Sequence, residues 1–203
     1  MTGRIFIDLF TTLDGVAQAP GGPDEDPSGG FPYGGWQAPF PDEAIGAAVW
    51  QGISELDALL LGRRTYDIFA AYWPHQDGRI AEVFNRVPKY VVSRGDLAPG
   101  WEGTTRLGAD VDAEVGALRE RHDDIHVIGS VDLVQTLLRE RLFDVLTLWV
   151  YPVVLGQGKK VFPDGATPAN MTLLEPALTG PRGVVQLRYG PADGTPATGT
   201  VEE

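Results

Sequence analysis

The stretch from residue 125 to residue 162 constrains the fold of this chain more than any other part of the sequence. A strand that ends in glycine and leads directly into a helix brings bare backbone N–H groups and a helix N-terminus together, and this geometry binds phosphate and other anions. Many such turns only reverse the chain, so the motif alone leaves both interpretations open. The pattern predicts a short buried strand at 125–128, a turn at Gly129 and Ser130, a helix at about 132–140 and a longer strand at about 144–150.

The rest of the chain continues this alternation of strands and helices. Such alternation predicts a largely parallel sheet covered by helices on both faces, and the two last strands, which have no helix between them, predict antiparallel edges. The sequence therefore favours an α/β fold with a mixed sheet. We expect further strands at 4–10, 58–61, 89–93, 104–107, 171–178 and 184–189, and further helices at 42–55, 63–71 and 110–121.

At 203 residues, the chain is long enough for one domain, and two segments depart from the pattern. Residues 20–41 are rich in Gly, Pro and Asp, which predicts a long loop. The aromatic residues of this loop argue against a bare linker, and loops of this length inside a domain are usually functional or mobile. Residues 191–203 have a composition typical of a disordered tail. We therefore expect a single domain at 1–190 followed by a tail.

Composition excludes several classes of function. The net charge of −12 is unlike that of a nucleic-acid-binding protein, which needs a basic face. No apolar run approaches the roughly 20 residues of a membrane span, and no signal pattern is present, so we expect a cytoplasmic protein that does not bind membranes. The chain has no cysteine, and its three histidines lack the spacing of metal ligands, so we expect no metal.

Three predicted strand ends carry groups suited to a phosphate-rich ligand. They are the segment 62–65 (Gly-Arg-Arg-Thr), the pair Ser93 and Arg94, and the pair Gly129 and Ser130. Consecutive parallel strands place these ends at one edge of the sheet, and arginine suits bidentate contacts with phosphate. Each arginine alone could be an ordinary surface residue, but the three ends together favour a ligand site.

Other sequence signatures of ligand binding and catalysis are missing. The chain has no G-x-G-x-x-G after a strand and no Walker A sequence. The run at 156–160 (GQGKK) is faintly similar to a phosphate loop, but no helix is expected after it, and we interpret it as a turn. No G-x-S-x-G elbow and no other nucleophile is evident, so a bound redox cofactor would have to carry any chemistry.

These residues bring a family resemblance into view. The segments TTLDG, LLLGRRTY, VVSR, VIGS and LFDVLTLWVYPVVLGQGKKVFP, in this order, resemble the dihydrofolate reductase-like superfamily. The resemblance covers about residues 4–190, and it points to the branch that contains the riboflavin-biosynthesis reductase, the RibD C-terminal domain. It implies an eight-stranded sheet with NADPH lying across the strand ends.

The resemblance also implies contacts to the cofactor. Ser93 and Arg94 would hold the adenosine 2′-phosphate, which favours NADPH over NADH. The family usually has Gly-Gly, often joined by a cis peptide, where this chain has Gly129 and Ser130. Asp132 is a second departure from the family pattern, because it adds a negative charge at the start of a helix. The remaining contacts implied for the cofactor are those of Gly62, Arg63, Arg64 and Thr65 with the phosphates, and those of Gly129, Ser130, Val131 and Asp132 along the pyrophosphate, with Leu133 nearby.

Hydride reduction also needs a proton source beside the acceptor. In folate-reducing relatives, a tryptophan in the N-terminal loop precedes a carboxylate at the start of the next helix, and Trp36 and Asp42 resemble that pair. Asp42 is thus a candidate catalytic acid, although its position also suits a plain helix N-cap. Glu43 could take the role instead, or act only as a first-turn carboxylate. Asp14 is either a turn residue or a donor, and we group Trp36, Asp14 and Glu43 as candidate substrate contacts.

The function implied by the resemblance is that of an NADPH-dependent reductase. It would transfer hydride to a small heterocyclic, imine-type or carbonyl acceptor, in the manner of a 5-amino-6-(5-phosphoribosylamino)uracil reductase or a folate reductase. The chain lacks the zinc-binding deaminase domain that often precedes this reductase, so it would be a free-standing member of the fold. The alternative is a module that binds a nucleotide or another ligand without turnover.

A homodimer is a further expectation. The strand at 144–150 could expose Trp149 to a second copy of the chain, although core packing explains the same strand equally well.

Overall fold

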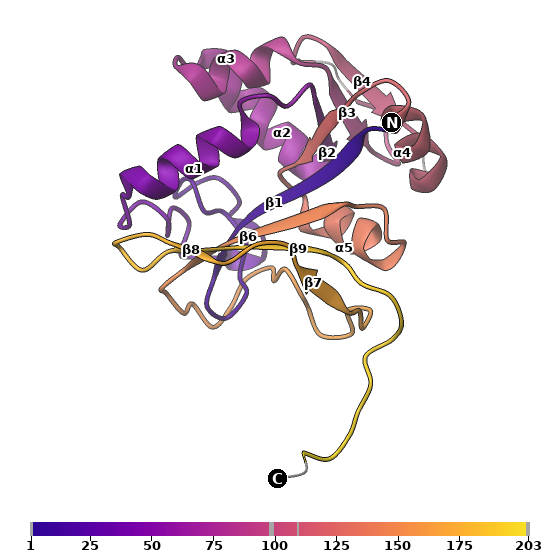
Figure 1. The fold of residues 1–203 in the computed structure, drawn as a ribbon. Coiled ribbons are helices and arrows are strands. Elements are labelled where there is room, and N and C mark those ends of the chain that lie inside the picture. The colour runs from indigo at the N-terminus through magenta and orange to yellow at the C-terminus, as the bar shows by residue number, and fades with distance from the viewer. Residues whose placement is uncertain (1, 98–99, 109, 202–203) are drawn as a thin grey trace.

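A computed structural model describes residues 2–97, 100–108 and 110–201 and shows one twisted sheet with helices on both of its faces (Figure 1). The strands are β1 (Arg4–Thr12), β2 (Ala58–Gly62), β3 (Lys89–Val92), β4 (Thr104–Leu107), β5 (Asp124–Val127), β6 (Val145–Tyr151), β7 (Met171–Leu173), β8 (Leu178–Thr179) and β9 (Val185–Pro191). The α-helices are α1 (Glu43–Ile53), α2 (Arg63–Tyr72), α3 (Arg79–Arg86), α4 (Val111–Arg119) and α5 (Val131–Arg139), and short 3-10 turns lie at Ser28–Gly30 and Trp73–His75.

The strands follow the order β4-β3-β2-β5-β1-β6-β9-β7, and β8 pairs with β9 beside β7. Pairing is parallel from β4 to β6 and antiparallel where β9 meets its three neighbours. The predicted mixed and mainly parallel α/β sheet is therefore confirmed. Because β1, β2, β3 and β5 run parallel, their carboxyl ends lie at one edge of the sheet, as the phosphate-site prediction requires.

Within the described residues, the sheet has nine strands where eight were expected. The predicted strand at 171–178 is two strands, β7 and β8, and both pair with β9. They are separated at Glu175 and Pro176, since proline has no N–H group with which to continue a ladder of hydrogen bonds. A second omission is α3, which the sequence analysis did not assign and which buries Ala81, Val83 and Phe84.

Two hydrophobic clusters cover the two faces of the sheet. On one face, Ile5, Ile7 and Leu9 of β1 pack against α4 and α5. On the opposite face, Leu59 and Leu61 of β2 pack against α1, α2 and α3. Since side chains alternate along a strand, every second residue of a strand belongs to the same face. Phe6, Asp8 and Phe10 therefore point to the side of α1.

The environment of Trp149 contradicts the expectation that it faces a partner. Strand β6 lies inside the sheet between β1 and β9 (Figure 1), and Trp149 is only 3% exposed. Its ring packs near Phe10 in a third cluster formed with the loop that precedes α1. Core packing therefore accounts for this residue, and association into a homodimer stays a prediction.

The C-terminal segment is a strand for longer than the sequence suggested, because β9 continues through Pro191. Residues 192–201 contain no helix or strand, and residues 202 and 203 of the expected tail lie outside the described residues. None of the helices formed by the described residues has both the length and the apolar character needed to cross a membrane.

Candidate active site

The N-termini of α2 and α5 meet at the carboxyl ends of β2 and β5. The Gly62 N–H donates to the Gly129 carbonyl over 3.3 Å. A Cβ on Gly62 would lie 2.9 Å from the Cβ and 3.1 Å from the N of Ser130. Gly129 has φ +112°, and a Cβ there would lie 2.6 Å from Oγ1 of Thr65. Both glycines are needed because the starts of the two helices pack directly on each other.

The turn at residues 129 and 130 has two notable features. The peptide bond between Gly129 and Ser130 is cis, as it often is in the family that the sequence resembles. The Ser130 hydroxyl caps α5 by accepting from the Leu133 N–H at 3.5 Å. Leu133 itself is buried in the core beneath the helix, so it supports the site from below.

The predicted cationic residues also lie at this edge. Val92 is the register partner of Gly62, which places Ser93 beside the start of α2. The Arg63 guanidinium donates to Asp67 over 2.8 Å and to the Asp96 carbonyl over 2.7 Å. Ser93 forms a local turn with Gly95, and Arg94 is exposed to solvent. The structure therefore brings the first two predicted strand ends together along one edge.

A pocket of about 270 Å³ lies beside the start of α5. Val131, Asp132 and Gln135 form one wall, and Gly158, Lys159 and Lys160 form another. The segment at 156–160, interpreted from the sequence as a turn, thus supplies two lysines to the same edge of the sheet. A β-bridge between Lys160 and Val16 holds it there. The sequence interpretation recognised the turn but missed its place at the site.

A buried carboxylate, Asp26, joins two of these cations. Its Oδ1 accepts from Arg64 at 2.9 Å, and its Oδ2 accepts from Nζ of Lys159 at 2.6 Å. Burial alone would raise the pKa of Asp26, but hydrogen bonds from Lys159 and Ser28 and the charge of Lys159 outweigh it and lower the pKa to about 2. Asp26 therefore fastens the long loop to α2 and to the lysine segment.

The loop at 20–41 folds onto the sheet, so Phe31 and Trp36 are buried in the core and Phe40 packs against it, whereas Tyr33 stays exposed. The Trp36 indole N–H donates to the Gln18 carbonyl over 2.8 Å, and its ring meets Tyr151 edge-on at 5.4 Å. Tyr151 also accepts from the Gln37 side chain at 2.7 Å. Burial, reinforced by the charge of Asp42, raises the pKa of Tyr151 despite the hydrogen bond from Gln37. Trp36, a predicted substrate contact, is thus a buried anchor of the loop.

Asp42 occupies the N-cap position of α1. Its Oδ1 accepts from the backbone N–H groups of Ala44 and Ile45, and its Oδ2 accepts from the N–H of Arg182. Asp42 therefore has the role of a helix N-cap, which its sequence position also allowed. Glu43 is an exposed residue in the first turn of the same helix.

Asp14 lies in the turn after β1, where its carboxylate accepts from the Thr12 hydroxyl and from two backbone N–H groups, those of Leu155 and Gly156. Partial burial acts to raise the pKa of Asp14, but these hydrogen bonds prevail and lower it. Asp14 therefore ties the end of β1 to the segment after β6, which is the turn role weighed for it.

Sequence reasoning missed two groups near the site. Asp26 and Lys159 are 133 positions apart, and no local pattern announces such a pair. The second group is Asp8 with His126, which are joined across β1 and β5 by a 2.7 Å contact. The sequence did carry a signal for this pair, because Asp8 and His126 are polar residues at inward positions of two predicted strands.

Comparison with known proteins agrees with this architecture. Residues 4–185 match the family model described as the RibD C-terminal domain. The protein YyaP of Bacillus subtilis (strain 168), whose function is uncharacterised, is 27% identical over 192 residues, covering 92% of this chain and 94% of YyaP.

Solved structures share the fold at lower sequence identity. A pyrimidine reductase-like protein from Corynebacterium diphtheriae superimposes with a TM-score of 0.65 at 13% identity, covering 95% of this chain and 93% of the other. Dihydrofolate reductase from Enterococcus faecalis, complexed with NADP(H), superimposes with a TM-score of 0.59 at 14% identity, covering 95% and 99%. Both likenesses concern the fold.

Proposed function

Because the chain belongs to the RibD C-terminal domain family, we propose that it is an NADPH-dependent reductase of a small heterocyclic, imine-type or carbonyl acceptor. The single observation that carries the proposal is the meeting of two helix N-termini with cationic side chains at one sheet edge. An acidic protein of net charge −12 repels anions overall, so an anionic cofactor needs such a local arrangement.

The residues at this edge fit the phosphates of NADPH. Helix α2 begins at Arg63 after Gly62, which provides no side-chain cap, so its first N–H groups are free of an internal carboxylate or hydroxyl. The pocket at the start of α5 adds Lys160, while Lys159 in the same wall is paired with Asp26. Arg94, beyond β3, is exposed and would pair with the 2′-phosphate together with Ser93. These groups would hold the cofactor along the edge from β3 to β5.

When bound, NADPH supplies the hydride for reduction. The chain's own part is to orient the acceptor and to give it a proton. The aromatic rings of the loop at 20–41 pack over β6, and this would keep water away from that end of the sheet. The acceptors best supported by the family are 5-amino-6-(5-phosphoribosylamino)uracil and related pyrimidines.

The first test is a side-by-side titration of NADPH and NADH, followed by the fluorescence of the five tryptophans. We expect NADPH to bind at least tenfold more tightly than NADH, since Arg94 would pair with the 2′-phosphate. Arg94→Ala should remove most of this preference while leaving NADH affinity unchanged. At 100 times its Kd, NADPH should stabilise the wild-type protein by about 2.7 kcal/mol.

An exposed arginine at the far end of α5, away from the helix start that forms the site, provides the matched control. Arg139→Ala, at the end of α5, should leave both affinities as they are in the wild type. Absence of NADPH binding by the wild type would overturn the proposed function. Tight binding without oxidation of NADPH by pyrimidines, pterins, imines or carbonyls would instead favour the alternative, a nucleotide-binding module without turnover.

A further inference from the structure

A partly exposed acid, Asp8, and a buried histidine, His126, form a pair on the face of the sheet that α1 and α2 cover. Nδ1 of His126 lies 2.7 Å from Oδ2 of Asp8. The ring of Phe6 stacks on the imidazole with centroids 4.8 Å apart, so His126 is held from two sides. The side chain of His126 is 4% exposed and that of Asp8 is 16% exposed. Asp8 is therefore the more reachable member of the pair.

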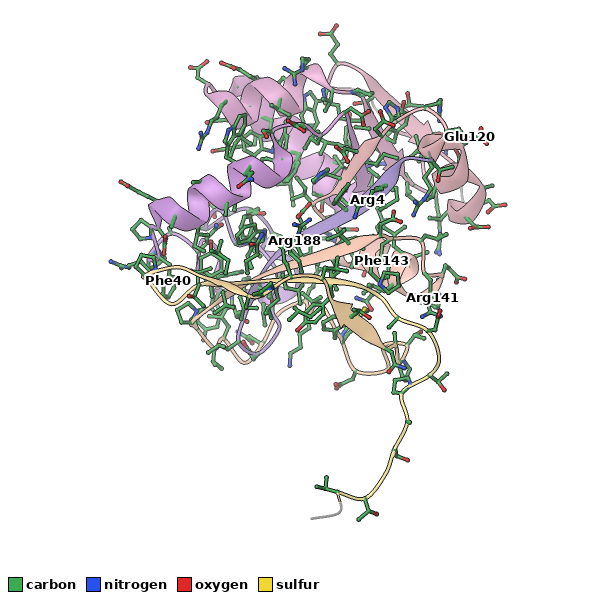
Figure 2. All side chains as sticks on the ribbon, in the orientation of Figure 1. Arg4, Phe40, Glu120, Arg141, Phe143 and Arg188 are labelled. Carbon is green, nitrogen blue, oxygen red and sulfur yellow. The ribbon has the colours of Figure 1, made fainter. Side chains whose placement is uncertain are left out.

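Two further polar side chains lie in the same row as Asp8. Thr147 on β6 is the register partner of Asp8, and Arg188 on β9 is the register partner of Thr147. Partners in a ladder point to the same face of a sheet. Arg188 is paired with Glu175 at 3.1 Å and lies on the side of the sheet that faces α1 (Figure 2). An acid, a hydroxyl and a guanidinium thus follow one another across three strands.

Between this row and the sheet edge that carries the cofactor residues, the same face is apolar. Phe10 and Trp149 follow Asp8 and Thr147 by two residues on β1 and β6, and Ile128, two residues after His126, lies level with Asp8. Ile7 is the register partner of Val127, so Asp8 lies level with Ile128, and the row is about 3 Å along the strands from Gly129. Asp8 is therefore close to the turn that carries the predicted cofactor residues. Ligand sites typically combine apolar walls with a few convergent polar groups.

The carboxylate predicted to donate the proton is engaged elsewhere. Three backbone N–H groups already occupy the two oxygens of Asp42. Asp8, by contrast, has a side-chain partner with an exchangeable proton. Of these two carboxylates, Asp8 has the contacts suited to proton transfer.

We propose that Asp8 is the acid that protonates the reduced acceptor, that His126 positions it, and that Thr147 and Arg188 bind the polar edge of the same acceptor. The inference rests on the proposed reductase function and gives it a proton source and a substrate-binding face. His126 is a positioning residue, since it is enclosed and acts through Asp8.

The proposed step balances as follows. The acceptor carbon gains a hydride from NADPH, which becomes NADP⁺, and a new C–H bond forms. The π electrons of the C=N or C=O bond move to the nitrogen or oxygen. That atom takes one proton from the pair of Asp8 and His126, and water then returns a proton to the pair. The acceptor thus gains one hydride from NADPH and one proton from the pair, which is two electrons and two protons in all, and water replaces the proton of the pair.

The test measures turnover of 5-amino-6-(5-phosphoribosylamino)uracil through the oxidation of NADPH. Asp8→Asn should lower kcat about 100-fold or more while the Kd for NADPH changes less than twofold. His126→Asn keeps a donor near the place of Nδ1 and should retain activity within tenfold of the wild type. His126→Leu removes the donor, and its kcat should fall to that of Asp8→Asn. This difference separates positioning from mere support of the fold.

A second acid and histidine, at the other end of the sheet, provide the control. Asp57 lies 3.7 Å from His122, and Asp57→Asn should leave kcat unchanged. Thermal unfolding of every variant shows whether it is folded at the assay temperature. Full activity of a folded Asp8→Asn variant would overturn the proposal.

A second test, which does not depend on turnover, follows the NMR signals of the ring nitrogens of the three histidines. Adding NADP⁺ with the pyrimidine should shift the signals of His126 and leave those of His75 and His122 in place. Unmoved His126 signals in a protein that binds NADPH would refute the proposed site alone. Failure to bind NADPH at all would instead refute the proposed function.

Discussion

Replacing Gly62 by alanine should destabilise the protein by about 3 kcal/mol, because the new methyl group overpacks the junction of the two helix starts. Its Cβ would lie 2.9 Å from the Cβ and 3.1 Å from the backbone N of Ser130. Gly62 has φ −74° and ψ 154°, a conformation that alanine adopts freely, so the cost comes from packing. The new methyl group should also move the start of α2 away from α5, and this movement should weaken NADPH binding at least tenfold.

Denaturant unfolding of four proteins measures this effect: the wild type, Gly62→Ala, Ser130→Gly and the double variant. Ser130→Gly removes Oγ and Cβ of Ser130, the two atoms nearest to the new methyl group, so the double variant should regain more than half of the stability lost. Gly46→Ala is the matched control, since a Cβ there meets no atom of the described residues within 4 Å. It lies inside α1 and should stabilise by about 0.5–1 kcal/mol. Equal stabilities of Gly62→Ala and the wild type would contradict the close approach.

Replacing Asp26 by alanine should cost about 2–3 kcal/mol of stability and loosen the loop at 20–41. The variant leaves Arg64 and Lys159 without their shared carboxylate, but both cations are partly exposed, which limits the cost. Because Asp26 ties the loop to two distant segments, cleavage within residues 20–41 by a protease should become faster. Asp24→Ala, at an exposed position of the same loop, is the control and should change neither the stability nor the rate of cleavage.

The contribution of Asp26 to the free energy of unfolding should decrease as the pH is lowered. The pKa of Asp26 is about 2 in the folded protein, against an ordinary value of 3.8, so the folded state binds fewer protons between these values. Stability from Asp26 is therefore fully present above about pH 4 and is lost as pH falls toward 2. Unfolding free energies of wild type and Asp26→Ala should converge over this window. A difference that stays constant from pH 6 to pH 3 would show that the carboxylate acts only through packing.

Much of the fold was predictable because it follows from local patterns. Strand β4 and the starts of β1, β2 and β3 fall where alternation and apolar runs place them. Helix α1 begins after Asp42, as a capping residue dictates. The segment from β5 through α5 to β6 is a strand, a glycine turn and a helix leading into a long strand. Each of these features depends on residues within a few positions of one another.

Errors occurred where neighbouring strands or distant residues decide the outcome. The run at 171–178 has the composition of one strand, but the pairing with β9 divides it into β7 and β8. Trp149 is suited equally to an interface and to a core, and only the position of β6 inside the sheet buries it. Asp42 could have been an acid or a cap, and its contact with Arg182 shows both oxygens engaged in backbone contacts.

The sequence by itself determined the class of fold and the three strand ends that carry glycine, serine and arginine, since periodicity and turn chemistry act over short distances. Only the tertiary structure decided which side chains meet there. Asp26 with Lys159 and Asp8 with His126 are separated by 133 and 118 positions, and parallel strand pairing and loop folding bring them within hydrogen-bond distance. The strand order of the sheet, which no local pattern encodes, therefore assembles the groups proposed to do the chemistry.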